Sequence, residues 1–340
     1  MDLQLSAEQE QLVAALAGLY SKHASSEAVR KAESSDGFDP ALWGRLTEMG
    51  LVAMAVGEAN GGWGATTLDL ALAVEQHGRA VGPAPLVEAQ VAARLLDRLG
   101  DPAVSEVVSG ERMITVALHP AVDGTARGVP AGAVADAAIV LHEGALVLVD
   151  LDGRRQTFEN LGSLPLADIS LHGVSPDGPG ARVLAAGPDA GAALERATDD
   201  WLCLTAASLV GLGARALEIG VDYVKERHAF GVPIGSFQAV AHPLADSATA
   251  LDGARFLALE AAWAADEDID RAAELAGMAF GFAGDAARAV TAQALHVHGG
   301  YGFMMEYDIQ LYWRRARAWT NVWGEPSLAY RRAAAMRLGA

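Results

Sequence analysis

The sequence is poor in cysteine and in positive charge. Its single cysteine, Cys203, excludes an intrachain disulfide and any metal cluster built on several cysteines. Lysine and arginine number 25 against 43 aspartates and glutamates, so the formal net charge is −18. Binding to nucleic-acid phosphates or to an anionic membrane requires clustered cations, so this balance argues against both kinds of partner. Any anionic ligand must be met by a few local cations.

Long uncharged apolar runs and a secretion signal are also missing. The longest predominantly apolar stretch without charge lies between Asp200 and Arg215, and a membrane helix needs about 18 apolar residues. The chain begins acidic and amphipathic, whereas a signal peptide begins basic and continues apolar. We therefore expect no membrane span and a cytoplasmic location.

The 340 residues contain enough apolar sequence for a sizeable core. Hydrophobic residues make up 51% and charged residues 20%, which excludes a disordered chain. Helical periodicity dominates both ends, and short β-rich runs separated by Gly, Pro and Asp fill the middle. We predict a mainly α protein with an inserted small β domain. Its three domains are an N-terminal helical domain (1–110), a middle β domain (111–190) and a C-terminal helical bundle (191–340).

Local signals place several elements. Ser6 and Gln9 have the spacing of a capping box, and Asp39 followed by Pro40 predicts another helix start. Residues 142–144 are typical of a hairpin turn between two strands. The long helices of the C-terminal part are predicted at residues 194–226, 237–265, 271–298 and 326–338.

Residues 211–216, GLGARA, match the G-x-G-x-x-A fingerprint of dinucleotide-binding proteins. That fingerprint is meaningful only between a strand and a helix of a βαβ unit, and the residues before it favour a helix. We interpret these small residues as a close contact between two helices and reject a dinucleotide site.

Two further blocks favour a ligand. Arg227 ends a long helix and is followed by an aromatic residue, a Gly-x-Pro turn and a new helix, a combination suited to a pyrophosphate. In the second block, three glycines within four positions follow His298 and leave room for a ligand. His296 and His298 point to different faces of a helix, so we predict no metal site there.

Together these blocks resemble the flavin-dependent acyl-CoA dehydrogenases. Residues 227–238 are similar to the family's R-x-x-F-G-x-x-I-x-x-F-Q segment, and residues 298–303 to its H-G-G-x-G-F turn. Residues 50–64 and 75–79 are similar to its N-terminal helical domain, and the order helical, β, helical matches the family fold, whose C-terminal part is a four-helix bundle.

The resemblance implies an oxidoreductase that desaturates an acyl-CoA thioester between its α- and β-carbons. FAD is the implied cofactor, shared between two subunits, and an electron-transferring flavoprotein or similar acceptor is the implied electron partner. The implied FAD contacts are Arg227, Phe230, Ile234, Phe237, Gln238, His296, Gly299 and Gly300. His296 replaces the usual glutamine of the turn, which weakens one expected contact.

The chain departs from the family at the catalytic base. Aligning the last glycine turn puts Trp323 where the usual glutamate belongs, and the alternative base position, counted back from Arg227, falls on Trp201. The remaining candidates are Glu325, two residues beyond Trp323, and Asp200. Glu325 could equally be a helix N-terminal carboxylate stabilised by the helix dipole.

The β domain is also short and lacks the T-x-P-x-x-G-S-D-like loop that seats the flavin ring in the family. Short members of the family form pairs in which the companion subunit supplies the base. We therefore expect one subunit of a hetero-oligomer with a second acyl-CoA dehydrogenase chain. Two alternatives stay open: a self-sufficient homo-oligomer that uses Glu325 or Asp200 as its base, and a non-catalytic structural subunit.

Overall fold

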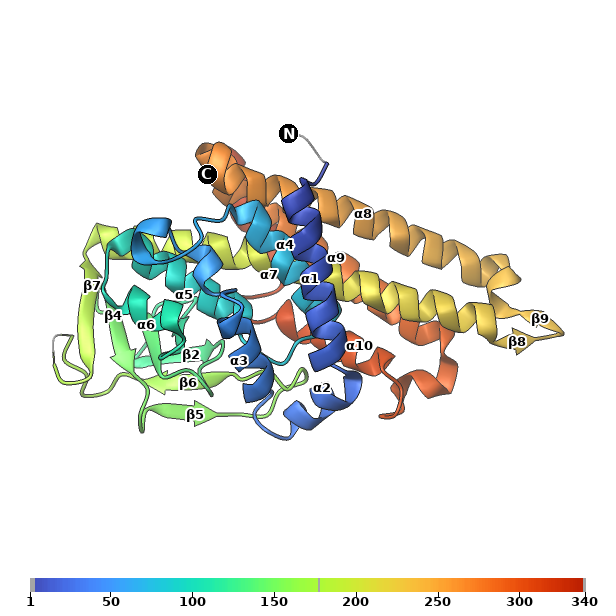
Figure 1. The fold of residues 1–340 in the computed structure, drawn as a ribbon, viewed down its shortest axis with the longest axis horizontal. Helices are drawn as coiled ribbons and strands as arrows, with labels where there is room; N and C mark the ends of the chain where they lie inside the picture. The colour runs from blue at the N-terminus through green and yellow to red at the C-terminus, as the bar shows by residue number, and fades with distance from the viewer. Residues whose placement is uncertain (1–3, 177, 339–340) are drawn as a thin grey trace. The chain divides into compact units, whose positions relative to one another are not determined.

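The computed structural model of the protein describes residues 4–176 and 178–338 (Figure 1). Its backbone contacts divide the chain into two compact units. The first comprises Met1–Ser26, Ala71–Gly82 and Leu202–Ala340, and the second comprises Glu27–Leu70 and Pro83–Trp201. Helices α4 (Thr67–Arg79) and α7 (Pro188–Glu226) contribute residues to both units.

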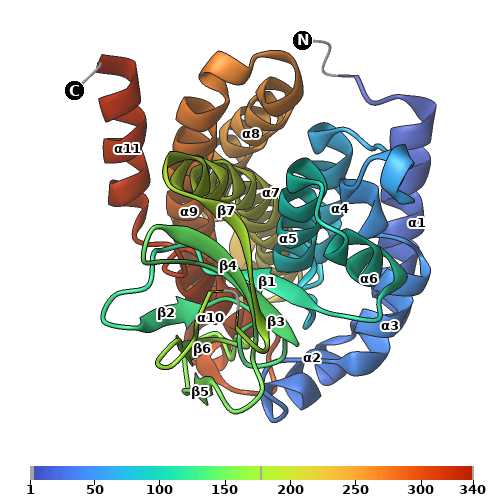
Figure 2. The same cartoon turned by 90° about the vertical axis from the view of Figure 1, so that its left-hand side faces the viewer.

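The first unit is helical. Besides its parts of α4 and α7, it contains α1 (Ala7–His23), α8 (Gln238–Glu267), α9 (Ile269–Val297), α10 (Ile309–Trp319) and α11 (Pro326–Leu338). Only Asp268 separates α8 from α9, and the two helices pack along each other, whereas α11 packs on α9 (Figures 1 and 2). A Cβ at Gly281 of α9 would lie 2.8 Å from the ring of Tyr330, so a glycine is needed for this close approach.

The predicted helix starts are confirmed. The side chain of Ser6 accepts a hydrogen bond from the Gln9 amide, and the side chain of Gln9 accepts one from the Ser6 amide, which closes the capping box of α1. Asp39 caps α3 (Pro40–Glu48) by accepting from the Ala41 amide at 2.9 Å. Each cap satisfies backbone N–H groups that a helix start leaves without a partner.

The GLGARA segment lies inside α7 and mediates helix packing, as predicted. A Cβ at Gly211 would lie 1.9 Å from the carbonyl oxygen of Glu75 on α4. Reciprocally, a Cβ at Gly78 of α4 would lie 1.9 Å from the carbonyl oxygen of Ser208. Glycines on both helices therefore allow the two backbones to approach closely, and the residues directly before the motif are helical.

The second unit contains helices and two small sheets. Its helices are α2 (Ser26–Glu33), which begins at the last residue of the first unit, α3, α5 (Leu86–Leu99) and α6 (Ala103–Ser109). Its strands are β1 (Ile114–Val116), β2 (Thr125–Val129), β3 (Ala137–His142), β4 (Ala145–Asp150), β5 (Arg155–Thr157), β6 (Ala167–Ser170) and β7 (Ala181–Ala186). They form one sheet in the order β1-β3-β4-β7 and another in the order β2-β6-β5 (Figure 2).

The predicted hairpin joins β3 to β4. Its two turn residues, Glu143 and Gly144, have φ angles of 49° and 80°, as this kind of tight hairpin requires. Pairing is antiparallel between β3 and β4, between β4 and β7 and throughout the second sheet, whereas β1 pairs with β3 in parallel. Apolar residues from both sheets, among them Val140, Val149 and Ile169, form one buried core.

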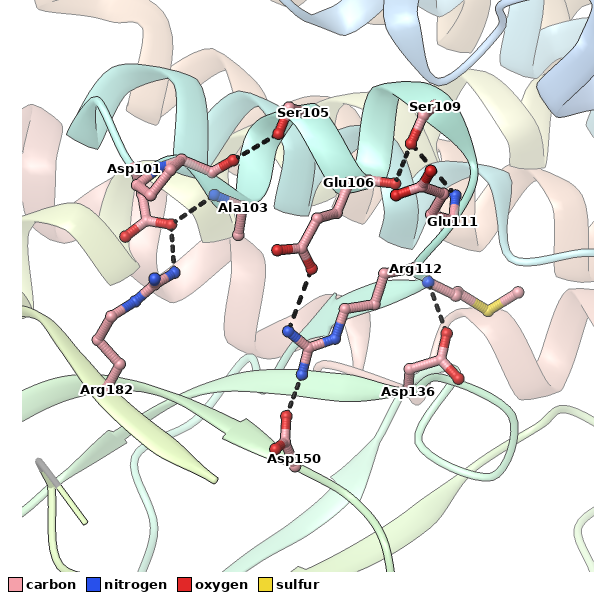
Figure 3. A network of polar contacts seen from close by, with 12 residues as sticks. Asp101, Ala103, Ser105, Glu106, Ser109, Glu111, Arg112, Asp136, Asp150 and Arg182 are labelled. Carbon is pink, nitrogen blue, oxygen red and sulfur yellow. Dashed lines mark hydrogen bonds and ion pairs between the residues drawn. The ribbon is translucent and has the colours of Figure 1, made fainter. Parts of the chain in front are cut away.

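A polar network ties α6 to the first sheet. Arg112 pairs with Glu106 on α6 and with Asp150 at the end of β4 (Figure 3). Nearby, Arg182 of β7 donates to Asp101 at 2.5 Å (Figure 3). These ion pairs are partly exposed, so they position the helix more than they stabilise the unit.

Two predictions from the sequence concern where the domains and the helices lie. The strands β1 to β7 all lie between residues 114 and 186, and the three-domain division with boundaries at 110 and 190 stays a prediction. Helix α10 was absent from the predicted helices.

The expectation of no membrane span depended on the lack of a long uncharged apolar stretch. By length and composition α7 is the one helix in the described part of the chain that could cross a membrane, and 72% of its most apolar window is buried inside the protein.

Candidate functional site

The segment after α7 forms a small projecting hairpin in the first unit. Strands β8 (His228–Ala229) and β9 (Val232–Pro233) pair in antiparallel fashion at the end of α7 (Figure 1). The two turn residues, Phe230 and Gly231, both have positive φ angles, 55° and 87°. A non-glycine residue in this region of backbone conformation is uncommon, so the hairpin holds Phe230 in a strained position at its tip.

Phe230 is almost completely exposed, at 97%. Its ring contacts Phe237 edge to face, with 6.2 Å between ring centroids. Burying a phenylalanine side chain is worth roughly 1.5–3 kcal/mol. A strained backbone that presents this ring to solvent is therefore typical of a segment that another molecule covers.

Arg227, at the base of the hairpin, has no ion-pair partner among the residues that the structure describes, and its side chain is exposed. Its backbone is fixed, because its amide donates to Tyr223 and its carbonyl accepts from Ile234 at 2.7 Å. Ile234 and Phe237 are half-buried, and the exposed Gln238 begins α8. The predicted cofactor contacts of this block thus share one end of the first unit.

The glycine-rich turn lies at the same end. His298, which ends α9, stacks on Tyr223 of α7 with 4.1 Å between ring centroids, so the ends of α7 and α9 are in contact. Burial lowers the pKa of His298, and a hydrogen bond from its ring to the Ala294 carbonyl opposes this effect in part. The neutral imidazole of His298 therefore anchors the turn, whereas His296 is exposed.

The glycines of this turn differ in what they need. A Cβ at Gly302 would lie 2.6 Å from the carbonyl oxygen of Leu295, so this position requires a glycine for packing. Gly299 has a φ angle of 60°, which favours glycine for conformational reasons. Gly300 has neither restriction: nothing in the described chain lies within 4 Å of an added Cβ. The space in front of it is free for a ligand that approaches the backbone closely.

The segment of the family's usual base follows α10. The ring of Trp323 packs edge to face on Phe280 of α9, with 6.2 Å between centroids. Glu325 is exposed immediately before α11, and its carbonyl accepts from the Leu328 amide. Glu325 lies at a helix N-terminus, where the helix dipole stabilises a carboxylate. This position is compatible with the interpretation of Glu325 as a helix N-terminal carboxylate.

Asp200 belongs to the second unit, where it is 5% exposed. Arg98 donates to both of its carboxylate oxygens, at 2.5 and 3.2 Å, and Arg94 lies 3.8 Å away. A bidentate guanidinium favours the ionised carboxylate and occupies its lone pairs. This geometry suits a structural ion pair better than a base that must reach a substrate.

A further carboxyl group lies beside Trp201, and the sequence analysis missed it. The indole nitrogen of Trp201 donates to Glu88 of α5 at 3.4 Å. Burial raises the pKa of Glu88, opposed in part by a backbone hydrogen bond and by the contact with Trp201. The sequence indicates a buried carboxyl group here only through the position of Glu88, the one acidic residue in the mainly apolar stretch 84–93.

No group of three or more His, Cys, Asp or Glu side chains that could hold a metal ion occurs in residues 4–176 and 178–338. The cofactor-binding candidates gather at one end of the first unit, and Glu325 follows α10 in the same unit. Asp200 belongs to the other unit.

Comparison with known proteins decides the family. The family models "Acyl-CoA dehydrogenase, N-terminal domain" and "Acyl-CoA dehydrogenase, C-terminal domain" match residues 6–108 and 202–335. Acyl-CoA dehydrogenase IpdE2 of Mycolicibacterium smegmatis is 34% identical over 334 residues, which cover 96% of this chain and 98% of that protein. The chain belongs to the acyl-CoA dehydrogenase family.

Solved structures of acyl-CoA dehydrogenases have the same fold. The Tcur3481-Tcur3483 steroid ACAD G363A variant is 28% identical, with a TM-score of 0.86 and 98% of each chain covered. The ChsE4-ChsE5 complex from Mycobacterium tuberculosis is 25% identical, with a TM-score of 0.89 and full coverage of both chains. The predicted fold class and the prediction of an oxidoreductase of this family are therefore confirmed.

Proposed function

We propose that this chain is one subunit of a hetero-oligomeric, FAD-dependent acyl-CoA dehydrogenase, in which the companion subunit carries the catalytic base. The observation that carries the proposal has two parts. The predicted cofactor contacts gather at an exposed end of the first unit, and tryptophan occupies both base positions, Trp323 and Trp201. The proposed reaction is the α,β-desaturation of an acyl-CoA thioester.

The residues at the exposed end fit FAD. Arg227 would meet the pyrophosphate with a free guanidinium, and Phe230, Ile234, Phe237 and Gln238 would lie along the cofactor. His296, Gly299 and Gly300 would line its other side, where the open position at Gly300 permits a close approach. Held by these residues, FAD would supply the acceptor for the hydride of the substrate β-carbon. Phe230 has a strained backbone and an exposed ring, which supports a site in which a second chain covers the bound cofactor.

The residues at the two base positions support the hetero-oligomer. Tryptophan cannot accept the α-proton, and the carboxylate of Asp200 is held by Arg98. The names of two relatives, Tcur3481-Tcur3483 and the ChsE4-ChsE5 complex, each join two components. The word "steroid" in the first name supports a bulky acyl-CoA of the steroid type as substrate. An electron-transferring flavoprotein or a similar protein is the proposed acceptor.

Co-expression with candidate companion chains tests this proposal. The chain purified alone should be colourless and inactive, and the complex should be yellow and should reduce an electron acceptor when an acyl-CoA is added. A yellow, active protein obtained from this chain alone would contradict the hetero-oligomer.

A self-sufficient homo-oligomer is the second candidate, and the exposed carboxylate of Glu325 is the observation in its favour. The Glu325→Gln variant separates the two. Removal of a catalytic base lowers turnover by about 100- to 10,000-fold. We expect the assembled complex with Glu325→Gln to retain turnover within about twofold, and a loss of the larger size would make Glu325 the base.

A further inference from the structure

A cavity of about 570 Å³ lies between the turn after α2 and the loop that joins β5 to β6. Every residue that lines it belongs to the second unit, whereas the predicted cofactor contacts belong to the first. Sites for small molecules commonly have volumes of roughly 300–1,000 Å³. The cavity is therefore large enough for a small organic molecule, and none of the proposed cofactor contacts takes part in it.

The walls of this cavity are held by the chain itself. Gly37 has a φ angle of 70°, and a Cβ there would lie 1.8 Å from the carbonyl oxygen of Ser163, so the turn after α2 packs directly against the loop. The side chain of Asn160 donates to the Leu164 carbonyl at 2.8 Å and accepts from the Leu164 amide at 2.9 Å. These contacts close the loop on itself, so the fold shapes the cavity without the help of a ligand.

Three carboxylates line the cavity, and they come from Glu33, Asp36 and Glu159. No lysine, arginine or histidine is among the described residues that line it. The side chains of Asp36 and Glu159 are exposed, and neither makes an ion pair or a hydrogen bond within residues 4–176 and 178–338. Arg155 of β5, the basic residue nearest to the loop in sequence, donates to two backbone carbonyls instead. A cation in the cavity would therefore relieve the repulsion between these like charges.

The rest of the lining favours an organic cation over a metal ion. Phe158 lines the cavity with a ring that is 43% exposed, and Leu164 and Leu166 line it as well. An ammonium group close to an aromatic ring gains a cation–π interaction. No group of three or more His, Cys, Asp or Glu that could hold a metal ion occurs in the described part of the chain, so the three carboxylates do not converge on one point. Carboxylates at separate positions, with apolar side chains in the same cavity, match a chain of methylene groups that carries several ammonium groups.

We propose that this cavity binds a di- or polyamine, whose ammonium groups pair with Asp36 and Glu159 and whose methylene groups pack on Phe158. Each ammonium group offers up to three hydrogen-bond donors to carboxylate oxygens, and the methylene groups cover apolar surface. The proposed dehydrogenase function does not require this site, so each proposal is tested without the other.

Calorimetric titration of the full chain with spermidine tests the proposal. The double variant Asp36→Asn, Glu159→Gln removes two charges from the cavity, and asparagine tolerates the positive φ angle of 54° at position 36. The control double variant, Glu111→Gln with Asp152→Asn, removes two exposed charges from the same unit outside the cavity. Because exposed ion pairs are individually weak, we expect the first variant to bind spermidine about tenfold more weakly and the control to stay within about twofold of the wild type.

Two results of this titration would overturn the proposal. Equal losses in the two double variants would show that spermidine responds only to the overall negative charge of the protein. Absence of binding by the wild type in the millimolar range would show that the cavity does not hold an amine. Circular dichroism should be the same for both double variants and the wild type, because all four substituted residues are exposed.

Two further measurements test the chemical class of the ligand. Phe158→Leu keeps every carboxylate and removes the aromatic ring, so it should weaken spermidine binding by about threefold. Magnesium chloride should bind the wild type at least about tenfold more weakly than spermidine, and equal binding that the Asp36→Asn, Glu159→Gln variant abolishes would make this a metal site. If that variant changes only association with a companion chain, measured by sedimentation, the carboxylates serve a protein interface and the amine site is refuted.

Discussion

The indole nitrogen of Trp201 lies 3.4 Å from the carboxyl oxygen Oε1 of Glu88. Trp201 is the residue that the family resemblance predicts at one of the two base positions, and Glu88 comes from a helix 113 residues earlier in the chain. The structure thus places a carboxyl group, with its pKa raised by burial, next to this tryptophan. This pair is the first target for substitution.

Replacing Glu88 with Gln should stabilise the protein at neutral pH. Because burial raises its pKa in the folded state, the folded protein binds the proton more tightly than the unfolded chain. Stability contributed by this group is therefore lost as pH rises from its unfolded pKa through its folded one. The melting temperature of Glu88→Gln should exceed that of the wild type at pH 7, and the difference should shrink at pH 4. The exposed Glu195→Gln serves as the control, and an equal gain there would contradict this prediction.

Breaking the pair between Arg98 and Asp200 should be costly. Removing one partner of a buried ion pair typically destabilises a protein by about 3–5 kcal/mol, and the partial exposure of Arg98 places Arg98→Ala near the lower end. Urea unfolding should show this loss, whereas the exposed Arg196→Ala should change stability by less than about 0.5 kcal/mol. If Arg98→Ala unfolds like the wild type, Asp200 has no structural role and becomes a candidate base again.

Phe230 should matter for assembly and not for folding. Its side chain is 97% exposed, so Phe230→Ser should leave the unfolding free energy within about 0.5 kcal/mol of the wild type. A central aromatic contact in an interface is worth about 2 kcal/mol or more, which corresponds to roughly a 30-fold weaker association. Analytical ultracentrifugation with the companion chain measures this loss. Val122→Ser, which changes another exposed apolar side chain, should leave association unchanged.

The two glycines Gly300 and Gly302 should respond differently to alanine. Gly302→Ala forces a Cβ to 2.6 Å from the Leu295 carbonyl oxygen, so it should destabilise the protein by about 1–3 kcal/mol. Gly300→Ala meets no atom of the described chain and should fold normally. If a cofactor approaches the backbone there, the flavin content of the Gly300→Ala complex should fall. Full flavin content in that complex would exclude a close cofactor contact at this position.

Much of the local structure was predictable because its causes are local. The capping box of Ser6 and Gln9, the Asp39-Pro40 helix start and the hairpin turn at Glu143 depend on residues within a few positions of each other. The G-x-G-x-x-A motif was also interpreted correctly, because a helical sequence precedes it. Helix α10 was not predicted; its buried residues, among them Ile309, Leu311 and Ala316, do not follow the single-face pattern that identifies an amphipathic helix.

The candidate site also has features that the sequence predicts and features that only the structure shows. Its predicted cofactor-binding blocks are continuous stretches of sequence, and the glycine spacing of residues 299–302 is readable without a structure. The distinction between Gly300 and Gly302 is not readable, because it depends on which backbone atoms lie opposite each glycine. The ion pair of Asp200, which argues against its use as a base, joins residues 102 positions apart.

The sequence by itself determined the family and the order of helical and β segments, since motifs and periodicity are properties of neighbouring residues, and it predicts tryptophan at both base positions. Only the tertiary structure decided which charges are neutralised. Arg98 meets Asp200, and Glu88 meets Trp201. These pairings arise when distant helices pack, and the burial that packing produces sets the energy of each charge.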